Sequence, residues 1–175
     1  MTHENIFSQS GSPTRIHKLA VLFDSPPHYG KGTVDWEGPE GFDVYDAAGC
    51  LLRYLKLLPE PAIPFVFYEQ FTGILEQDLD VTATIQAFQE VIRLIPVLNR
   101  QLLLYLLDTF AALTPFQNLM TTERLVATFQ PALLSRVPSG MSAEDHILAA
   151  KVMVFMTENQ DDFLPYQENF LPLTN

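Results

Sequence analysis

The 175-residue sequence has one cysteine, little basic charge and no long apolar run, and each shortage excludes a class of protein. With Cys50 alone, the chain cannot form an internal disulfide, which fits the reducing cytoplasm. Ten lysines and arginines against 21 acidic residues give a net charge of −11, so the basic surface that nucleic acids and anionic membranes require is missing. The longest apolar run, residues 102–107, is far shorter than the ~18 residues that span a bilayer. We therefore expect a cytoplasmic protein with no nucleic-acid partner and no membrane insertion.

The sequence also lacks the residue patterns of an active site. Its four histidines do not stand at metal-ligand spacing with acidic residues or with the cysteine; they are His3, His17, His28 and His146. It contains no G-x-S-x-G nucleophile turn and no glycine-rich phosphate loop. The first eleven residues are polar and predict no signal peptide. We expect no metal and no cofactor, and a binding or regulatory module is favoured over an enzyme.

What the chain does have is a high apolar content arranged with helical periodicity. Hydrophobic residues make up 47% of the sequence, and strand-like alternation is essentially absent. Thirteen prolines fall mostly between the helical stretches, where they give rigid connections. These features predict one all-α domain, a bundle of about seven helices over residues 1–165, followed by a tail over residues 166–175.

Capping residues and prolines place the expected helices. Asp43 precedes one helix, and Ser142 with Asp145 forms the capping-box pattern before another. The expected helices span residues 13–25, 44–58, 66–75, 82–95, 98–113, 122–129 and 143–158, the sixth stopping before Pro131. The loop over residues 28–42 is rich in glycine and proline, and Trp36 is predicted to pin it to the body of the domain.

The organising stretch is residues 51–71, in which a helix is stopped by prolines and a second helix follows. Pro59 ends the first helix, and Pro64 can serve as the first residue of the second. At 100° per residue the core face of the first helix holds Val44, Ala48, Leu51, Leu55 and Leu58. Leu52 and Lys56 share a neighbouring stripe about 80° away from that core line, so Leu52 is predicted to be partly exposed.

Several phrases together carry a family resemblance over nearly the whole chain. They are residues 6–19 (IFSQSGSPTRIHKL), 23–31 (FDSPPHYGK), 55–64 (LKLLPEPAIP), 98–105 (LNRQLLLY), 129–131 (FQP) and 155–163 (FMTENQDDF). As a set they resemble the Rho GTPase-activating protein (RhoGAP) domain, and the second half is most similar to fungal Rho-directed members. The resemblance implies an all-helical fold that grips a GTP-bound Rho-family small GTPase in signal transduction. It also implies an inserted arginine, the arginine finger, that speeds the partner's GTP hydrolysis roughly 10³–10⁵-fold.

The same resemblance shows where this chain departs from the family pattern. Ser8 stands at the arginine-finger position, and a short neutral hydroxyl cannot replace a planar cation. Leu52 replaces a usual basic residue, and Lys56 stands where the family has an arginine that braces the finger loop. The resemblance therefore implies a GTPase-binding site without a catalytic residue, made of Ser8, Leu52, Arg53, Lys56, Pro131 and Ala132, in which Ala132 replaces an asparagine that contacts the GTPase.

Three functions follow from this pattern. The first is a RhoGAP-like domain that binds a Rho-family GTPase while its activating effect is weak or lost. The second is a working activator that uses another arginine, Arg15 or Arg53. The third is a truncated, non-functional relic, because family domains carry a further helix ahead of the finger phrase.

Overall fold

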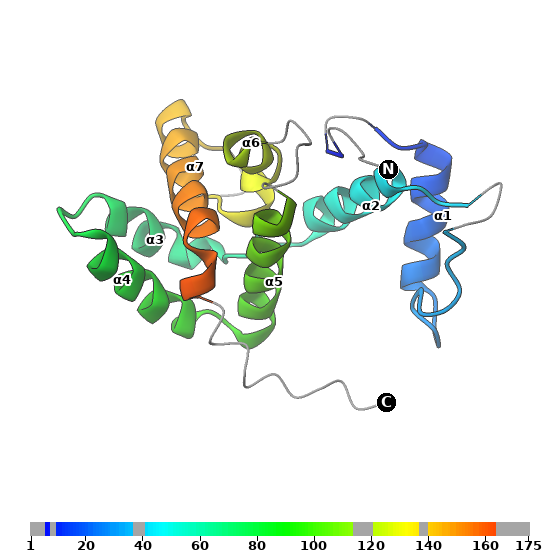
Figure 1. Cartoon of the computed structure of the whole chain (residues 1–175), viewed down its shortest axis with the longest axis horizontal. Coiled ribbons are helices and arrows are strands. Elements are labelled where there is room, and N and C mark those ends of the chain that lie inside the picture. Colours follow the sequence, from blue (N-terminus) through cyan, green and yellow to red (C-terminus); the bar gives the residue numbers. More distant parts are fainter. Residues whose placement is uncertain (1–5, 8–9, 37–40, 114–120, 137–139, 164–175) are drawn as a thin grey trace. The chain divides into compact units, whose positions relative to one another are not determined.

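The computed structural model describes residues 6–7, 10–36, 41–113, 121–136 and 140–163. These residues form seven α-helices and two short 3-10 helices, and their only strand-like feature is an isolated bridge (Figure 1). The predicted all-α class is confirmed. The chain divides into two compact units, residues 1–59 with 117–120 and residues 60–116 with 121–175. The predicted boundary between domain and tail lies outside the described residues.

The first unit consists of α1 (Pro13–Asp24) packed against α2 (Val44–Leu57). Both helices begin where the caps predicted, after Ser12 and after Asp43. The Asp43 carboxylate accepts hydrogen bonds from the amides of Tyr45 and Asp46, which satisfies two of the donors at the helix start. Helix α2 ends at Leu57, just before the proline-rich segment (residues 59–64), as predicted.

The loop between the two helices differs from its prediction at the tryptophan. Trp36 is 50% exposed, and its ring meets Phe42 edge-on, with 6.2 Å between the ring centroids. Phe42 belongs to the end of the same loop, directly ahead of α2. Trp36 therefore contacts its own loop and leaves half of its surface open, which matters for the cavity described below.

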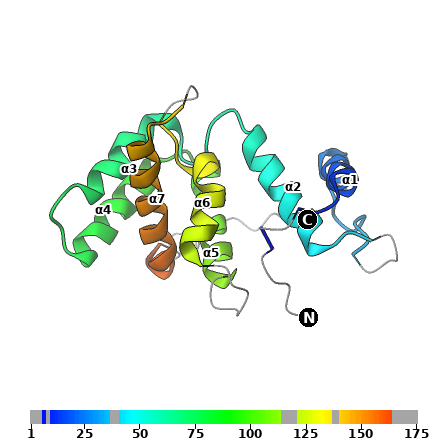
Figure 2. The same ribbon diagram turned by 90° about the horizontal axis from the view of Figure 1, so that it is seen from above.

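The second unit contains α3 (Tyr68–Leu75), α4 (Val81–Leu94), α5 (Val97–Leu113), α6 (Thr122–Leu133) and α7 (Ala143–Glu158). Figure 2 shows α6 and α7 running side by side, and they share the largest contact within this unit. Phe88 lies at the centre of an aromatic core, with the rings of Phe71, Phe155 and Phe163 5.5–6.5 Å from its own. The predicted capping box of Ser142 and Asp145 at the start of α7 is confirmed.

The helix after the proline-rich segment begins later than predicted. Pro64 leads into a short 3-10 helix, η1 (Phe65–Phe67), and α3 starts at Tyr68. The amide of Phe67 donates to the carbonyl of Pro64 at 2.9 Å, which is the tighter spacing of a 3-10 turn. Pro64 is therefore the residue ahead of a 3-10 turn and not the first residue of an α-helix.

The prediction that the sixth helix stops before Pro131 is wrong, because α6 continues to Leu133. The carbonyls of Ala132 and Leu133 accept hydrogen bonds from the amides of Ala62 and Ile63, at 3.1 and 2.9 Å. A proline in the last turn has no backbone N–H to donate. The bonds from the proline-rich segment instead hold the carbonyl groups at the end of α6. This contact joins segments seventy residues apart in the sequence, so no local pattern predicts it.

Candidate functional site

The predicted GTPase-binding residues fall on both units of the structure. Leu52, Arg53 and Lys56 lie on α2 in the first unit, and Pro131 and Ala132 lie near the end of α6 in the second. The prediction for Ser8 lies outside the described residues. The residues on α2 and those on α6 thus form two separate groups, one in each unit.

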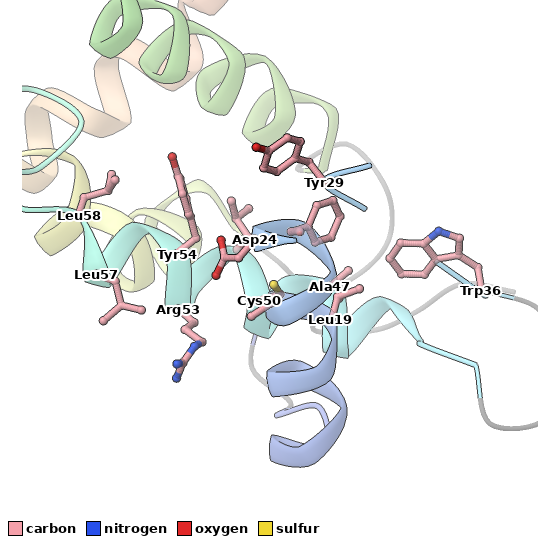
Figure 3. A pocket seen from close by; sticks show the side chains of 13 residues that line it. Leu19, Asp24, Tyr29, Trp36, Ala47, Cys50, Arg53, Tyr54, Leu57 and Leu58 are labelled. Atoms are coloured by element: carbon pink, nitrogen blue, oxygen red, sulfur yellow. The ribbon is translucent and has the colours of Figure 1, made fainter. Parts of the chain in front are cut away.

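On α2, Leu52 and Lys56 present one stripe and Arg53 lies on another. Leu52 is half-buried, as predicted, and Lys56, one turn later, is exposed. At 100° per residue these two side chains leave the helix about 40° apart, whereas Arg53 leaves it about 100° from Leu52. Arg53 lines a cavity of the first unit (Figure 3), so the structure separates it from the stripe of Leu52 and Lys56.

On α6, Pro131 is exposed and Ala132 is half-buried. The residue before them, Gln130, is buried, and its amide nitrogen donates to the carbonyl of Leu134 at 2.7 Å. The side-chain oxygen of Gln130 lies 3.1 Å from Nδ1 of His146 on α7. These bonds fix the backbone that presents Pro131 and Ala132. Sequence reasoning missed Gln130, although a polar residue among the apolar positions of a helix is a signal of a buried hydrogen bond.

The segment that follows position 8 is attached to the start of α2 by close backbone packing. A Cβ atom on Gly11 would lie 2.6 Å from Oδ1 of Asp46 and 2.7 Å from its backbone nitrogen, so only glycine fits there. The next amide, of Ser12, donates to Oδ1 of Asp46 at 2.8 Å. Residues 11 and 12 therefore have a fixed position relative to α2.

Asp46 itself is fully buried and carries the charge that holds the two helices together. Arg15 of α1 donates from Nε to Oδ2 of Asp46 at 2.5 Å and from Nη2 to Oδ2 of Asp43 at 2.7 Å. Burial alone would raise the pKa of Asp46, but the bonds from Arg15 and from the amides of Asp43 and Ser12 outweigh it and hold that pKa below its ordinary value. We call Gly11, Ser12, Arg15, Asp43 and Asp46 the Asp46 cluster.

The Asp46 cluster changes the interpretation of Arg15. The sequence offers this residue as an alternative finger, yet its guanidinium makes two ion pairs within the first unit. Moving it to a partner would leave the buried carboxylate of Asp46 without its counter-charge, which is unfavourable. Sequence reasoning missed the pairing of Arg15 with Asp46.

The described residues set limits on other chemistry. None of their helices is long and apolar enough to cross a membrane. No three of their His, Cys, Asp or Glu side chains converge in a way that could hold a metal ion.

Comparison with known proteins identifies the family. The model of the RhoGAP domain matches residues 1–137. The chain belongs to the RhoGAP domain family. It is 35% identical to Rho-GTPase-activating protein 5 of Schizosaccharomyces pombe, over 92% of this chain and 44% of that protein. It is 32% identical to Rho-GTPase-activating protein BAG7 of Saccharomyces cerevisiae, over 93% of this chain and 41% of that protein. This RhoGAP chain thus spans less than half the length of these fungal relatives.

Solved structures support the same fold. The crystal structure of human Rho GTPase activating protein 15 superposes with a TM-score of 0.79 at 22% identity, covering 93% of this chain and 75% of that one. The BH domain from GRAF, the GTPase regulator associated with focal adhesion kinase, gives a TM-score of 0.77 at 22% identity, covering 98% and 87%. The helical architecture of this RhoGAP chain is therefore shared with experimental structures.

Proposed function

We propose that this RhoGAP domain binds a GTP-bound Rho-family small GTPase in signal transduction and stimulates its GTP hydrolysis weakly or not at all. The observation that carries the proposal is Ser8 at the position where the family has its arginine finger. A serine hydroxyl is too short and uncharged to stabilise the charge that develops on the transferred phosphate. The domain is a regulator of its partner and not itself an enzyme.

The Asp46 cluster bears on the proposal in two ways. It engages Arg15, which is then unable to act as a replacement finger. It also attaches residues 11 and 12 to α2 through the Ser12–Asp46 hydrogen bond and the close packing at Gly11. The missing element is therefore the arginine side chain and not the support behind it.

The proposed GTPase contacts are Ser8, Leu52 and Lys56 in the first unit and Pro131 and Ala132 in the second. Lys56 is exposed and offers a cation on α2, while Leu52 offers an apolar side chain where the family resemblance expects a basic one. Pro131 is exposed on a backbone fixed by Gln130. These residues offer apolar and cationic contacts for binding, but they lack the arginine that accelerates hydrolysis.

A single-turnover GTP hydrolysis assay with Rho-, Rac- and Cdc42-type GTPases tests this proposal. We expect binding of a GTPase loaded with a transition-state mimic of GTP, and little stimulation of hydrolysis by the natural chain. Ser8→Arg should raise stimulation by at least about 10³-fold if the support is competent. Gln9→Arg is the matched control, because it adds the same charge one residue away and should give no gain.

Three results would contradict the proposal. Stimulation by several hundredfold with the natural chain would show a working activator. Absence of binding to all three GTPases, with the chain folded, would show that the interface itself is lost. A gain in Gln9→Arg equal to that in Ser8→Arg would remove the significance of position 8.

A second candidate is a working activator that uses Arg53. This residue is exposed, and its guanidinium has no ion pair among the described residues, in contrast to Arg15. If the natural chain does stimulate hydrolysis, Arg53→Ala should abolish the effect under this alternative. Stimulation that survives Arg53→Ala excludes it.

A further inference from the structure

The first unit contains a half-open cavity of about 670 Å³ between α1, the loop that follows it and α2 (Figure 3). Its floor is aliphatic and includes Leu19 and Leu51. Four aromatic side chains also line it and remain 45–60% exposed; they are Phe23, Tyr29, Trp36 and Tyr54. Large rings gathered at an opening and left half-exposed are typical of binding surfaces.

The cavity also contains an uncompensated negative charge. Asp24, the last residue of α1, lines it and is exposed, and its carboxylate has no ion pair or hydrogen bond among the described residues. Arg53 is the cation of the lining, but Figure 3 shows its side chain extending away from the labelled rings of Tyr29 and Tyr54. Aromatic faces and a carboxylate both attract cations, so the charge and the rings favour the same ligand class.

The thiol of Cys50, which also lines the cavity, does not compete with Asp24 for a cation. Burial raises the pKa of the Cys50 thiol, and the charge of Asp24 raises it further, while Arg53 acts in the opposite direction. The thiol therefore stays neutral at physiological pH and contributes an apolar wall. A neutral thiol beside a carboxylate neither repels nor replaces an incoming cation.

We propose that this cavity binds a lysine or arginine side chain, with a neighbouring apolar residue, from a partner protein. The cation would lie against Asp24 and the aromatic rings, and the apolar residue would cover Leu19 and Leu51. A small-molecule pocket encloses most of its ligand, whereas these rings stay half-exposed, which suits a side chain presented on a protein surface. The acidic balance of the whole chain favours approach of a basic partner.

The cavity lies on the other side of α2 from Leu52 and Lys56, the two proposed GTPase contacts on that helix. At 100° per residue, the side chains of Cys50 and Tyr54 leave the helix about 160° from that of Leu52. The side chain of Lys56 leaves it only about 40° from that of Leu52. A partner in the cavity would thus contact a different face of the helix from the GTPase. The inference therefore goes beyond the proposed function and can be tested without any GTPase.

Fluorescence of Trp36 gives a direct test, because it is the only tryptophan and it lines the cavity. The full chain is titrated with acetyl-Leu-Arg-Leu amide, with the citrulline peptide as its uncharged counterpart and with benzyltrimethylammonium. We expect the arginine peptide to change the Trp36 emission with a Kd of roughly 0.1–1 mM and the citrulline peptide to bind at least fivefold more weakly.

Two variants assign the effect to the cavity. Asp24→Asn should weaken the arginine peptide about fivefold, and Tyr54→Ala should weaken it by a similar factor, because each removes one attraction for the cation. Asp108→Asn is the control: this exposed residue of α5 does not line the cavity, and its change should leave the Kd unaltered. Asp24 has no partner among the described residues, so its variant should fold normally.

Several outcomes would overturn the proposal. Equal binding of the arginine and citrulline peptides would remove the role of charge. If benzyltrimethylammonium binds and the arginine peptide does not, the cavity is a small-molecule site. Self-association of the full chain that Asp24→Asn abolishes would assign the cavity to a second copy. Unchanged peptide binding in both Asp24→Asn and Tyr54→Ala would place the peptide elsewhere.

Discussion

The interiors of the two units of this RhoGAP chain are stabilised by different interactions. In the first, only Leu19, Ala48 and Leu55 are buried apolar residues among those described, and the buried charge of Asp46 joins the helices. In the second, large apolar side chains fill the interior around Phe88, and polar contacts such as those of Ser142 with Asp145 and of Gln130 with Leu134 accompany them. Charge pairing depends on geometry and pH, whereas apolar burial depends on area and volume.

This difference fits the proposed roles of the two units. A unit with a small core and several exposed rings has surface left for partners, and both the Asp46 cluster and the aromatic cavity belong to it. The second unit supplies a fixed frame for Pro131 and Ala132 through the bonds from Ala62 and Gln130. Substitutions at three residues can break or sharpen the comparison.

Phe88→Ala should have the largest effect on stability. The side chain is fully buried and contacts three other aromatic rings, so its loss leaves a cavity at the centre of the second unit. We expect the free energy of unfolding to fall by about 3–5 kcal/mol in urea denaturation. Leu98→Ala, at a residue that is 78% exposed, is the control and should change it by less than about 0.5 kcal/mol.

The same denaturation curves test the relic alternative. A cooperative transition of the natural chain would argue against a poorly folded remnant, whereas a broad transition without a defined midpoint would favour it. A loss below about 1 kcal/mol for Phe88→Ala would contradict the assignment of the aromatic core as the stabilising centre of the second unit.

Asp46→Ala should have the next largest effect, and it should be confined to the first unit. The substitution removes the acceptor for Arg15, Ser12 and the amide of Asp43, and we expect a cost of about 3 kcal/mol. Hydrogen exchange should show lost protection in α1 and α2 while the amides around Phe88 stay protected. Equal loss of protection in both units would contradict the separation of the two.

Asp46 also predicts how the first unit responds to acid. Its pKa in the folded chain lies below the ordinary value of 3.8, so the folded state binds fewer protons than the unfolded state as the pH falls. The stabilisation is fully present above about pH 4 and is lost as the pH falls through the lowered pKa. Asp46→Asn should flatten this acid dependence, measured as the change in Tm between pH 6 and pH 3.

Local chemistry explains which parts of this fold could be predicted. Asp43, Ser142 with Asp145, and Pro59 act on neighbouring residues, and the helix ends that they set were predicted. The errors at Pro131 and Pro64 arise where the proline-rich segment, through Ala62 and Ile63, bonds to the last turn of α6. Such contacts depend on the tertiary fold and leave no periodic pattern in the sequence.

The candidate site divides in the same way. The family resemblance predicts Leu52, Lys56 and Ala132 as GTPase contacts, whereas the pairing of Arg15 with Asp46 joins residues 31 positions apart and is visible only in three dimensions. In the sequence, Asp46 is an acid at the third position of a helix, and no local pattern links it to Arg15. An acid there has a sufficient local explanation in the capping box, which concealed its second partner.

Tyr68→Phe should have the smallest effect and the opposite pH dependence. Tyr68 of α3 is buried, and its hydroxyl donates to the carbonyl or carboxylate oxygen of Asp145 at 3.2–3.3 Å. Burial, and then the charge of Asp145, raises the pKa of Tyr68 to about 12. Removing the hydroxyl should cost about 1 kcal/mol at neutral pH, measured by urea denaturation.

The sign of the alkaline effect follows from that pKa. The tyrosine is protonated more strongly in the folded chain than at its ordinary pKa of 10, so its stabilisation is present below pH 10 and is lost as the pH rises toward 12. Tyr68→Phe should therefore reduce the alkaline loss of stability, while Tyr105→Phe, at a tyrosine that is 68% exposed, should leave it unchanged. An alkaline limb that persists in Tyr68→Phe would contradict this assignment. Asp46→Asn acts in the acid range and Tyr68→Phe in the alkaline range, so the two variants report on different units at opposite ends of the pH scale.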